Sequence, residues 1–322
     1  MRKISCAVAL VLAAASGRFA FAVLTVLAGA SVAPPALSME GSQSPYLKGY
    51  RDFASGVLPP PGVQFRQDIN VYSGGENSRI PQGQLTTSVR NVSSILGITV
   101  TTPVRVWGGS YGFAIRAAAT DTSADRTVTN RFGGVTSSSA SLTGFNDLVI
   151  SPLVLGWHHG NWHWNVSATA WMPSGNYEST RLVNTGRNYW SWSPQFAVTY
   201  LDREAGLEVS VATAYVVSYE NTATRYQSGD MAHIDMAAMK VIAPRLWVGA
   251  VGYAMSQVTG DSGAGNTLGE RKAEVFGAGP AVRYIMNVGN RPVALTAKYY
   301  REFSARNTTE GDTGAISLRF HF

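Results

Sequence analysis

Cysteine, charge and long apolar stretches are all scarce in this sequence. Its one cysteine, Cys6, lies near the N-terminus, so residues after it can form neither a disulfide nor a thiolate metal site. Charged residues make up only 14% of the 322 residues, less than an ordinary soluble domain carries. After residue 30, no apolar run approaches the roughly 20 residues that a membrane-spanning helix needs. A β-barrel remains compatible with these absences, because its apolar residues are hidden by alternation.

The N-terminus has the pattern of a targeting segment. Arg2 and Lys3 precede the apolar runs 4–15 and 19–28, and small residues at 28–30 offer a signal peptidase site. We therefore expect a signal peptide over residues 1–30, with a cleavage site that could lie as late as about residue 38; a permanent anchor is the alternative. Removing residues 1–30 leaves 23 Lys and Arg against 20 Asp and Glu, because this region holds three positive charges and no negative ones. The net charge of +6 then falls to +3, too mild to indicate a nucleic-acid partner.

From residue 62 onward, apolar and polar residues alternate with a period of two. In 162–170, Trp162, Trp164 and Val166 share one face, while Asn165 and Ser167 share the other. Such alternation indicates strands with one face toward an apolar medium and one toward water. The segments that pass or fit this test are 63–71, 91–101, 106–119, 147–156, 162–170, 190–200, 207–217, 231–241, 246–258, 273–286, 293–300 and 316–322. About twelve strands are predicted, each near the ~10 residues of a tilted outer-membrane strand.

The connections between these strands alternate in length. Short ones are expected at 101–105, 157–161, 202–206, 242–245 and 287–291, and long polar ones at 74–88, 120–146, 174–188, 220–230, 260–271 and 303–312. Outer-membrane barrels have short periplasmic turns and long outer loops, whereas a soluble β-sandwich has no reason to sort its loops by length. The sequence thus predicts an all-β fold: a transmembrane antiparallel barrel over residues 62–322, in the bacterial outer membrane. Residues 31–61, rich in proline, are expected to form either a plain leader or a periplasmic plug.

Aromatic residues gather at the ends of the predicted strands, as in the interfacial girdles of membrane proteins. The last strand alternates Ile316, Leu318, Phe320 and Phe322 with polar residues. A terminal aromatic on such a strand resembles the signal by which bacterial barrels reach the outer-membrane assembly machinery. We therefore expect Phe320 and Phe322 to act as an assembly signal and that machinery to be a partner, together with outer-membrane lipid.

Several runs resemble the bacterial family named after meta-pathway phenol degradation (MetA-type), which includes sphingosine-uptake-like outer-membrane proteins. The resemblance covers about residues 45–322 and is carried by 56–62 (GVLPPPG), 146–148 (NDL), 151–153 (SPL), 156–157 (GW), 160–163 (GNWH), 188–190 (NYW), 199–202 (TYLD), 257–265 (QVTGDSGAG) and 298–303 (KYYREF). It implies an outer-membrane barrel that takes up hydrophobic or aromatic compounds. Before Phe145, the stretch 120–146 shows no pattern of this family.

Enzymatic and metal chemistry finds little support. The run 260–263 (GDSG) superficially resembles the nucleophile motif of trypsin-like proteases, but no matching histidine segment accompanies it. The outer-membrane phospholipase, also a twelve-stranded barrel, carries a His-x-Ser-Asn-Gly motif that is absent here. His158, His159 and His163 could hold a transition metal, but a polar periplasmic turn is the favoured interpretation. We expect no enzyme activity, no catalytic residue, no metal and no cofactor.

Charged residues on the predicted inward faces are the candidate functional residues. Both signs occur among these lumen-lining candidates, which are Arg66, Asp68, Arg116, Glu208, His233, Asp235, Arg283, Lys298, Glu302 and Arg319. They could line a gated pore of mixed charge, or form an ion-pair network that fills a narrow barrel. The corresponding functions are a channel that takes up small hydrophobic or aromatic solutes by passive diffusion, and a structural or adhesive barrel with a closed lumen.

Overall fold

The computed structural model describes residues 39–40, 44–80, 83–267 and 269–322. The predicted signal peptide, residues 1–30, lies outside the described residues. Thirteen strands are present in the described part of the chain: β1 (Gly62–Ile80), β2 (Gly83–Val106), β3 (Gly109–Asn130), β4 (Val135–Phe145), β5 (Val149–His159), β6 (Trp162–Trp171), β7 (Ser191–Asp202), β8 (Leu207–Ser218), β9 (Met231–Ala243), β10 (Leu246–Gln257), β11 (Glu274–Val288), β12 (Arg291–Arg306) and β13 (Glu310–His321). No helix among these residues is long and apolar enough to cross a bilayer.

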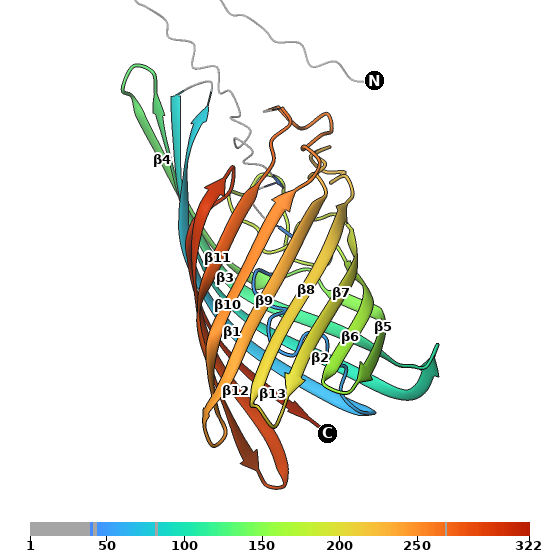
Figure 1. Ribbon diagram of the computed structural model, residues 1–322. Helices are drawn as coiled ribbons and strands as arrows, with labels where there is room; N and C mark the ends of the chain where they lie inside the picture. The colour runs from blue at the N-terminus through green and yellow to red at the C-terminus, as the bar shows by residue number, and fades with distance from the viewer. Residues whose placement is uncertain (1–38, 41–43, 81–82, 268) are drawn as a thin grey trace, which may run out of the picture. The chain divides into compact units, whose positions relative to one another are not determined.

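Twelve of the strands close into an antiparallel barrel (Figure 1). The first strand, β1, pairs with both β2 and the last strand β13, and β2 pairs with β3, so no gap is left at the seam. Two partners share β3: its first half pairs with β5, and its second half with β4. Strand β4 is therefore an addition outside the closed ring. The predicted all-β fold and antiparallel barrel are confirmed.

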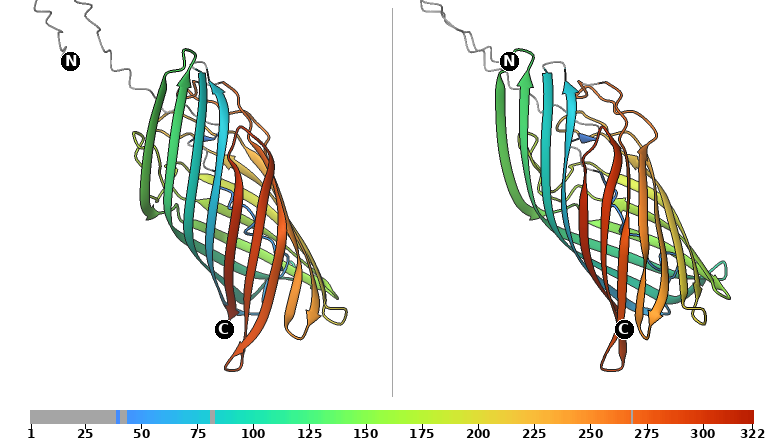
Figure 2. Two further views of the ribbon diagram at one scale, coloured as in Figure 1. Left: turned by 90° about the vertical axis from the view of Figure 1, so that its left-hand side faces the viewer. Right: turned by 60° about the vertical axis from the view of Figure 1, so that its left-hand side comes forward.

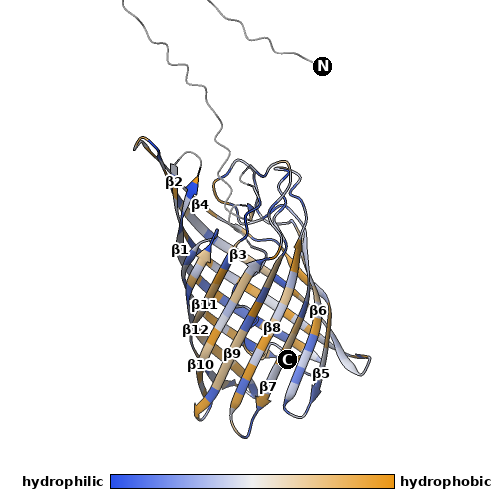
Figure 3. Ribbon diagram, turned by 45° about the horizontal axis from the view of Figure 1, so that its top comes forward, coloured by the Kyte–Doolittle hydropathy of each residue, from blue (hydrophilic) through white to orange (hydrophobic). Residues whose placement is uncertain are grey.

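The outer surface of the barrel is apolar. Ile69 on β1, Val166 on β6 and Ile316 on β13 are exposed there, and such residues recur along the strands (Figure 3). On β6 the alternate residues Asn165, Ser167 and Thr169 are buried inside, as the alternation predicts. A polar interior under a broad apolar exterior is the reverse of a soluble protein and suits a barrel surrounded by lipid. The chain is a bacterial outer-membrane β-barrel.

Strands β1, β2 and β3 are longer than predicted, and β4 lies where a loop was predicted. The expected loop 74–88 continues as paired β1 and β2 strands, and the expected loop 120–146 is mostly the β3–β4 hairpin, which projects beyond the rest of the barrel (Figure 2). The expected loop 303–312 likewise shrinks to a short turn between β12 and β13. These extensions are rich in Ser and Thr, and Thr favours strands. Both of their faces are polar, so the alternation test could not detect them.

One tight reversal is also displaced. The turn predicted at 101–105 lies instead at Trp107 and Gly108, whose φ angles of 49° and 77° suit the two-residue turns of hairpins. The short turns mark one end of the barrel, called here the short-turn end, where the C-terminus also lies (Figure 1). The loops 174–188, 220–230 and 260–271 lie at the opposite end, called the long-loop end.

Candidate functional site: the barrel interior

Residues 44–61, called here the lumen segment, run through the interior of the barrel (Figure 1). Before this segment, the backbone nitrogen of Met39 donates to Asp261 in a long loop. Further along, the backbone nitrogen of Gly56 donates to Thr199 on β7, and the carbonyl of Pro60 contacts the ring of His321 at the short-turn end. These contacts trace the segment from one end of the barrel to the other. It is not a strand, since its regular backbone bonds are limited to turns such as that from Tyr50 to Leu47.

Two of the candidate residues bind the segment through buried ion pairs. Lys298 on β12 lies 2.5 Å from Asp52 and also donates to the carbonyl of Gly49. Glu302, also on β12, lies 2.5 Å from Lys48 of the segment. Each carboxylate therefore has a cation at contact distance.

A second group surrounds residues 53 and 54. Glu208 on β8 pairs with Arg283 on β11 at 2.7 Å and accepts a hydrogen bond from the backbone nitrogen of Ala54. The Arg283 guanidinium lies 4.6 Å from the centre of the Phe53 ring. Arg319 on β13 donates to the carbonyl of Phe53. The backbone as well as the side chains of the segment is thus held by the wall.

Tyr50 is the centre of a third group. Arg66 on β1 donates to the Tyr50 carbonyl at 2.8 Å and lies 4.0 Å from the centre of its ring, while Arg116 on β3 lies 5.2 Å from that ring. Arg66 is also paired with Asp68 by two hydrogen bonds of 2.8 Å. Stacking two guanidinium groups on one ring uses the negative faces of its π-system. Tyr50 therefore fixes the segment against β1 and β3.

Tyr46 contacts β9. Its hydroxyl donates to Asp235 at 2.7 Å, and its ring stacks on His233 with the ring centres 3.7 Å apart. The structure brings all ten candidate residues to the interior, and nine contact the lumen segment directly. Asp68 reaches it through Arg66.

Sequence reasoning missed the partners of these residues. They are Tyr46, Lys48, Tyr50, Asp52 and Phe53, within the run YLKGYRDF, which also holds Arg51. The composition of this run could have revealed these residues. Six of its eight residues are charged or aromatic, and it forms no strand. The alternation test passes over such a stretch because it has no period of two.

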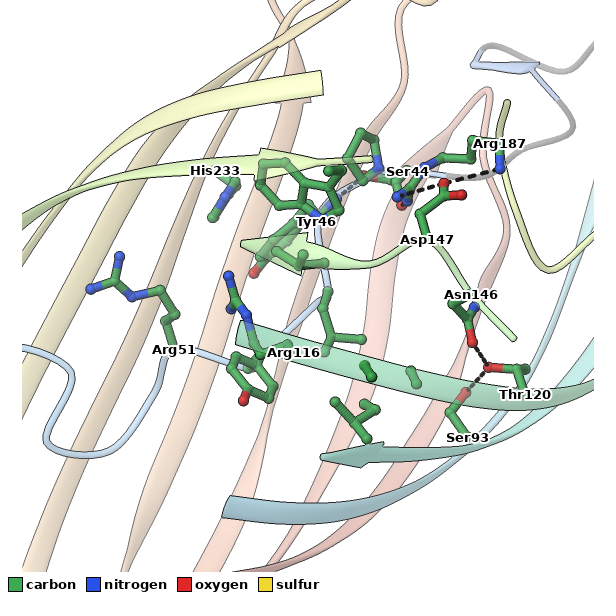
Figure 4. Close-up of a pocket in the computed structure, with 18 of the residues that line it drawn as sticks. Ser44, Tyr46, Arg51, Ser93, Arg116, Thr120, Asn146, Asp147, Arg187 and His233 are labelled. Carbon is green, nitrogen blue, oxygen red and sulfur yellow. Dashed lines mark hydrogen bonds and ion pairs between the residues drawn. The ribbon is translucent and has the colours of Figure 1, made fainter. Parts of the chain in front are cut away.

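Three adjoining cavities remain between the lumen segment and the wall formed by β1, β2, β3 and β5. The upper cavity, of about 250 Å³, lies toward the long loops and is lined by Tyr72, Asn91 and Thr122 among others. The middle cavity, of about 160 Å³, shares Ser93, Thr120 and Asn146 with it (Figure 4). The lower cavity, of about 140 Å³, shares Tyr50, Arg51 and Arg116 with the middle one. Because neighbouring cavities share lining residues, the three cavities lie in a row along one side of the lumen segment.

The long-loop end is closed by buried polar contacts. Asp261 accepts hydrogen bonds from Met39, Tyr226, Gly229 and Gln257. Asp147, which follows the β3–β4 hairpin, pairs with Arg187 at 3.1 Å. Through these two carboxylates, separate loops are tied together above the upper and middle cavities.

The short-turn end carries four of the five histidines and most of the tryptophans, whereas His233 lies in the interior on β9. His158 and His163 face each other across β5 and β6, with ring centres 6.1 Å apart, and Trp157 stacks on Trp164. His158 and His159 are the last residues of β5 and not part of a turn. Among the described residues, no group of three or more His, Cys, Asp or Glu is arranged to hold a metal ion.

The chain matches one known protein family and is similar to solved structures. The model of a family described as "Putative MetA-pathway of phenol degradation" matches residues 71–320. Among solved structures, an outer-membrane channel from Pseudomonas putida F1 is similar with 13% identity and a TM-score of 0.66, and the match covers 84% of this chain and 99% of that one. The transport unit of the autotransporter AIDA-I from Escherichia coli gives 11% identity, a TM-score of 0.48, and 84% and 95% coverage. No curated protein matches this chain.

Proposed function

This chain belongs to the family described as "Putative MetA-pathway of phenol degradation", and we propose that it is an outer-membrane channel through which hydrophobic or aromatic small molecules enter by passive diffusion. The observation that carries the proposal is the row of three adjoining cavities beside the lumen segment. A cavity of ~150 Å³ is large enough for benzene, so each of the three cavities can hold one aromatic ring. Tyr46, Tyr50 and Trp171 supply apolar surface to the middle cavity.

The lumen segment is the part that would regulate passage. Strand pairing fixes the wall, whereas side-chain contacts and single hydrogen bonds hold the segment. A small displacement of the segment would join the three cavities without breaking the wall. The solute then moves down its own concentration gradient.

The proposal is tested by uptake of radiolabelled naphthalene into a Gram-negative host whose outer membrane has few porins of its own. Cells that express the chain should take up naphthalene several-fold faster than cells that carry an empty vector. Equal rates at matched outer-membrane levels of a correctly folded barrel would refute a channel function.

A cross-link offers a matched control within the same protein. A Cβ at Gly156 on β5 would lie 2.6 Å from the Cβ of Leu58, so Leu58→Cys with Gly156→Cys needs only a shift of about 1 Å to reach disulfide geometry. Cys6 lies in the predicted signal peptide, so no other thiol would compete. Oxidation should slow uptake and a reductant should restore it.

A second candidate function is an adhesive barrel with a closed lumen. The observation that favours it is the projecting β3–β4 hairpin, whose tip carries Phe132 at 97% exposure. Cells that adhere through this hairpin should lose adhesion when residues 124–140 are replaced by a short Gly-Ser turn, with unchanged naphthalene uptake.

A further inference from the structure

The lower cavity has an unusual charge balance. Arg51, Arg66, Arg116 and Arg319 line it, and no Asp or Glu is among its lining residues. Arg66 is neutralised by Asp68. The other three arginines form no ion pair within the described part of the chain. A cavity inside the barrel is thus bounded by three positive charges that no carboxylate of the described residues pairs with at contact distance.

The partners of these three arginines are all neutral. Arg51 donates to Asn165, Ser167, Gln195 and the carbonyl of Ser55. Removing charges from water without an opposite charge is costly. An anion in the cavity would offset that cost for all three.

The rest of the cavity surface suits an aromatic ring. Tyr50, Phe53, Val57, Leu58 and Val154 contribute to the lining. The hydroxyl oxygen of Ser55, also on the lining, is buried and has no hydrogen-bond partner in the structure. The volume of about 140 Å³ accommodates a single ring with one small substituent at most.

We infer that the lower cavity binds the carboxylate of a small aromatic acid, held by Arg51, Arg116 and Arg319, with its ring against the apolar lining. This inference rests on the proposed channel function and adds aromatic carboxylates to the class of solutes that the channel takes. Guanidinium groups suit this role because their planar fork of N–H donors matches a carboxylate. Arg51 belongs to the lumen segment, while Arg116 and Arg319 belong to the wall, so the anion would also bridge the two.

The test is equilibrium binding of benzoate to the purified full chain in detergent, measured by titration calorimetry with benzamide as the uncharged analogue. Benzoate should bind at least tenfold more tightly than benzamide. Arg116→Gln and Arg51→Gln should each weaken benzoate binding at least tenfold, and Arg116→Lys should retain part of it. Arg203→Gln, at an exposed position in a short turn, is the matched control and should change nothing.

Equal binding of benzoate and benzamide to the unaltered protein, or no binding of either, would overturn the inference. This comparison needs no variant, so a variant that fails to assemble does not obscure the result. Naphthalene uptake is unaffected by that outcome, since it does not depend on a carboxylate. The channel proposal therefore fails only on the uptake result and the anion site only on the binding result.

Discussion

The wall of the barrel and the lumen segment are held by different forces. Each wall strand is fixed by backbone hydrogen bonds to two neighbours and by contact of its outer face with lipid. The lumen segment is held mainly by side chains, through the ion pairs of Asp52 and Lys48 and the stacking of Tyr46 and Tyr50. A membrane channel needs a wall that stays closed and an obstruction that can yield. Regular strand pairing suits the wall to the first requirement, and the weaker side-chain contacts suit the lumen segment to the second. The following changes test this difference.

The largest effect is expected on the lipid face of the wall. Val166 and Ser167 are neighbours on β6, and Val166 points outward whereas Ser167 points into the lower cavity. Val166→Glu should lower the amount of barrel in the outer membrane several-fold, because an acidic group on the lipid face opposes insertion, although less than the ~2–4 kcal/mol of Arg or Lys. Ser167→Glu should assemble normally, since its carboxylate would lie beside Arg51. Heat-modifiable gel migration measures both, and equal levels would show that the register of β6 is wrong.

A large effect on amount, but not on stability, is expected at the seam of the wall. Phe322 packs on Phe65 and Phe320 and exchanges backbone hydrogen bonds with Val63. Its deletion should sharply reduce the level in outer membranes if it is part of the assembly signal. Phe322 is 54% exposed, so its loss removes less than the ~1.5–3 kcal/mol of a fully buried Phe and should leave the melting of the assembled fraction nearly unchanged. Phe322→Trp is the control that keeps an aromatic ring, and a normal level after deletion would contradict the role in assembly.

Weakening the lumen segment should leave the wall intact. Asp52→Asn leaves Lys298 buried without its carboxylate partner, which costs ~3–5 kcal/mol in the seated state. Trypsin should then cleave after Lys48 and Arg51 at least about tenfold faster, because a cost of that size exceeds the ~1.4 kcal/mol of a tenfold change. Heat-modifiable migration of the barrel should be unchanged. Glu204→Gln, in an exposed short turn, is the matched control; unchanged cleavage in Asp52→Asn would show that the ion pair does not hold the segment.

Acid should also release the lumen segment from the wall, but by less than the Asp52→Asn substitution does. The Asp52 carboxylate pairs with Lys298 only while it is ionised, so acid that protonates it removes its contribution to holding the segment. Lys298, Arg66 and Tyr300 are the groups that face this carboxyl. Pepsin digestion of the segment should accelerate below about pH 4 in the unaltered chain. In Asp52→Asn the digestion should already be fast and change less with pH; an equally steep change would assign the acid response to other carboxylates.

The sequence predicted those parts of the molecule in which apolar and polar residues alternate. On β6, lipid outside and water inside impose a period of two, so Val166 and Ser167 could be placed from sequence alone. Beyond the membrane both faces of a strand meet water, so the pairing of Thr127 with Ser137 in the β3–β4 hairpin had no such signature. The same limit applies to the lumen segment, where Tyr46 and Asp52 follow no period. Their contacts became visible only when the barrel had closed around them.

The sequence by itself determined that the chain forms an outer-membrane barrel, because lipid selects the outward residue at every second position. It also determined which charged residues face away from lipid, since Lys298 and Glu302 lie on the polar side of their strand. Only the tertiary structure decided what those charges do. Lys298 lies 246 residues from Asp52 and Glu302 lies 254 residues from Lys48, and a local pattern cannot specify such pairings. The closed wall brings these groups together, and burial makes each charge of these two ion pairs costly without its partner.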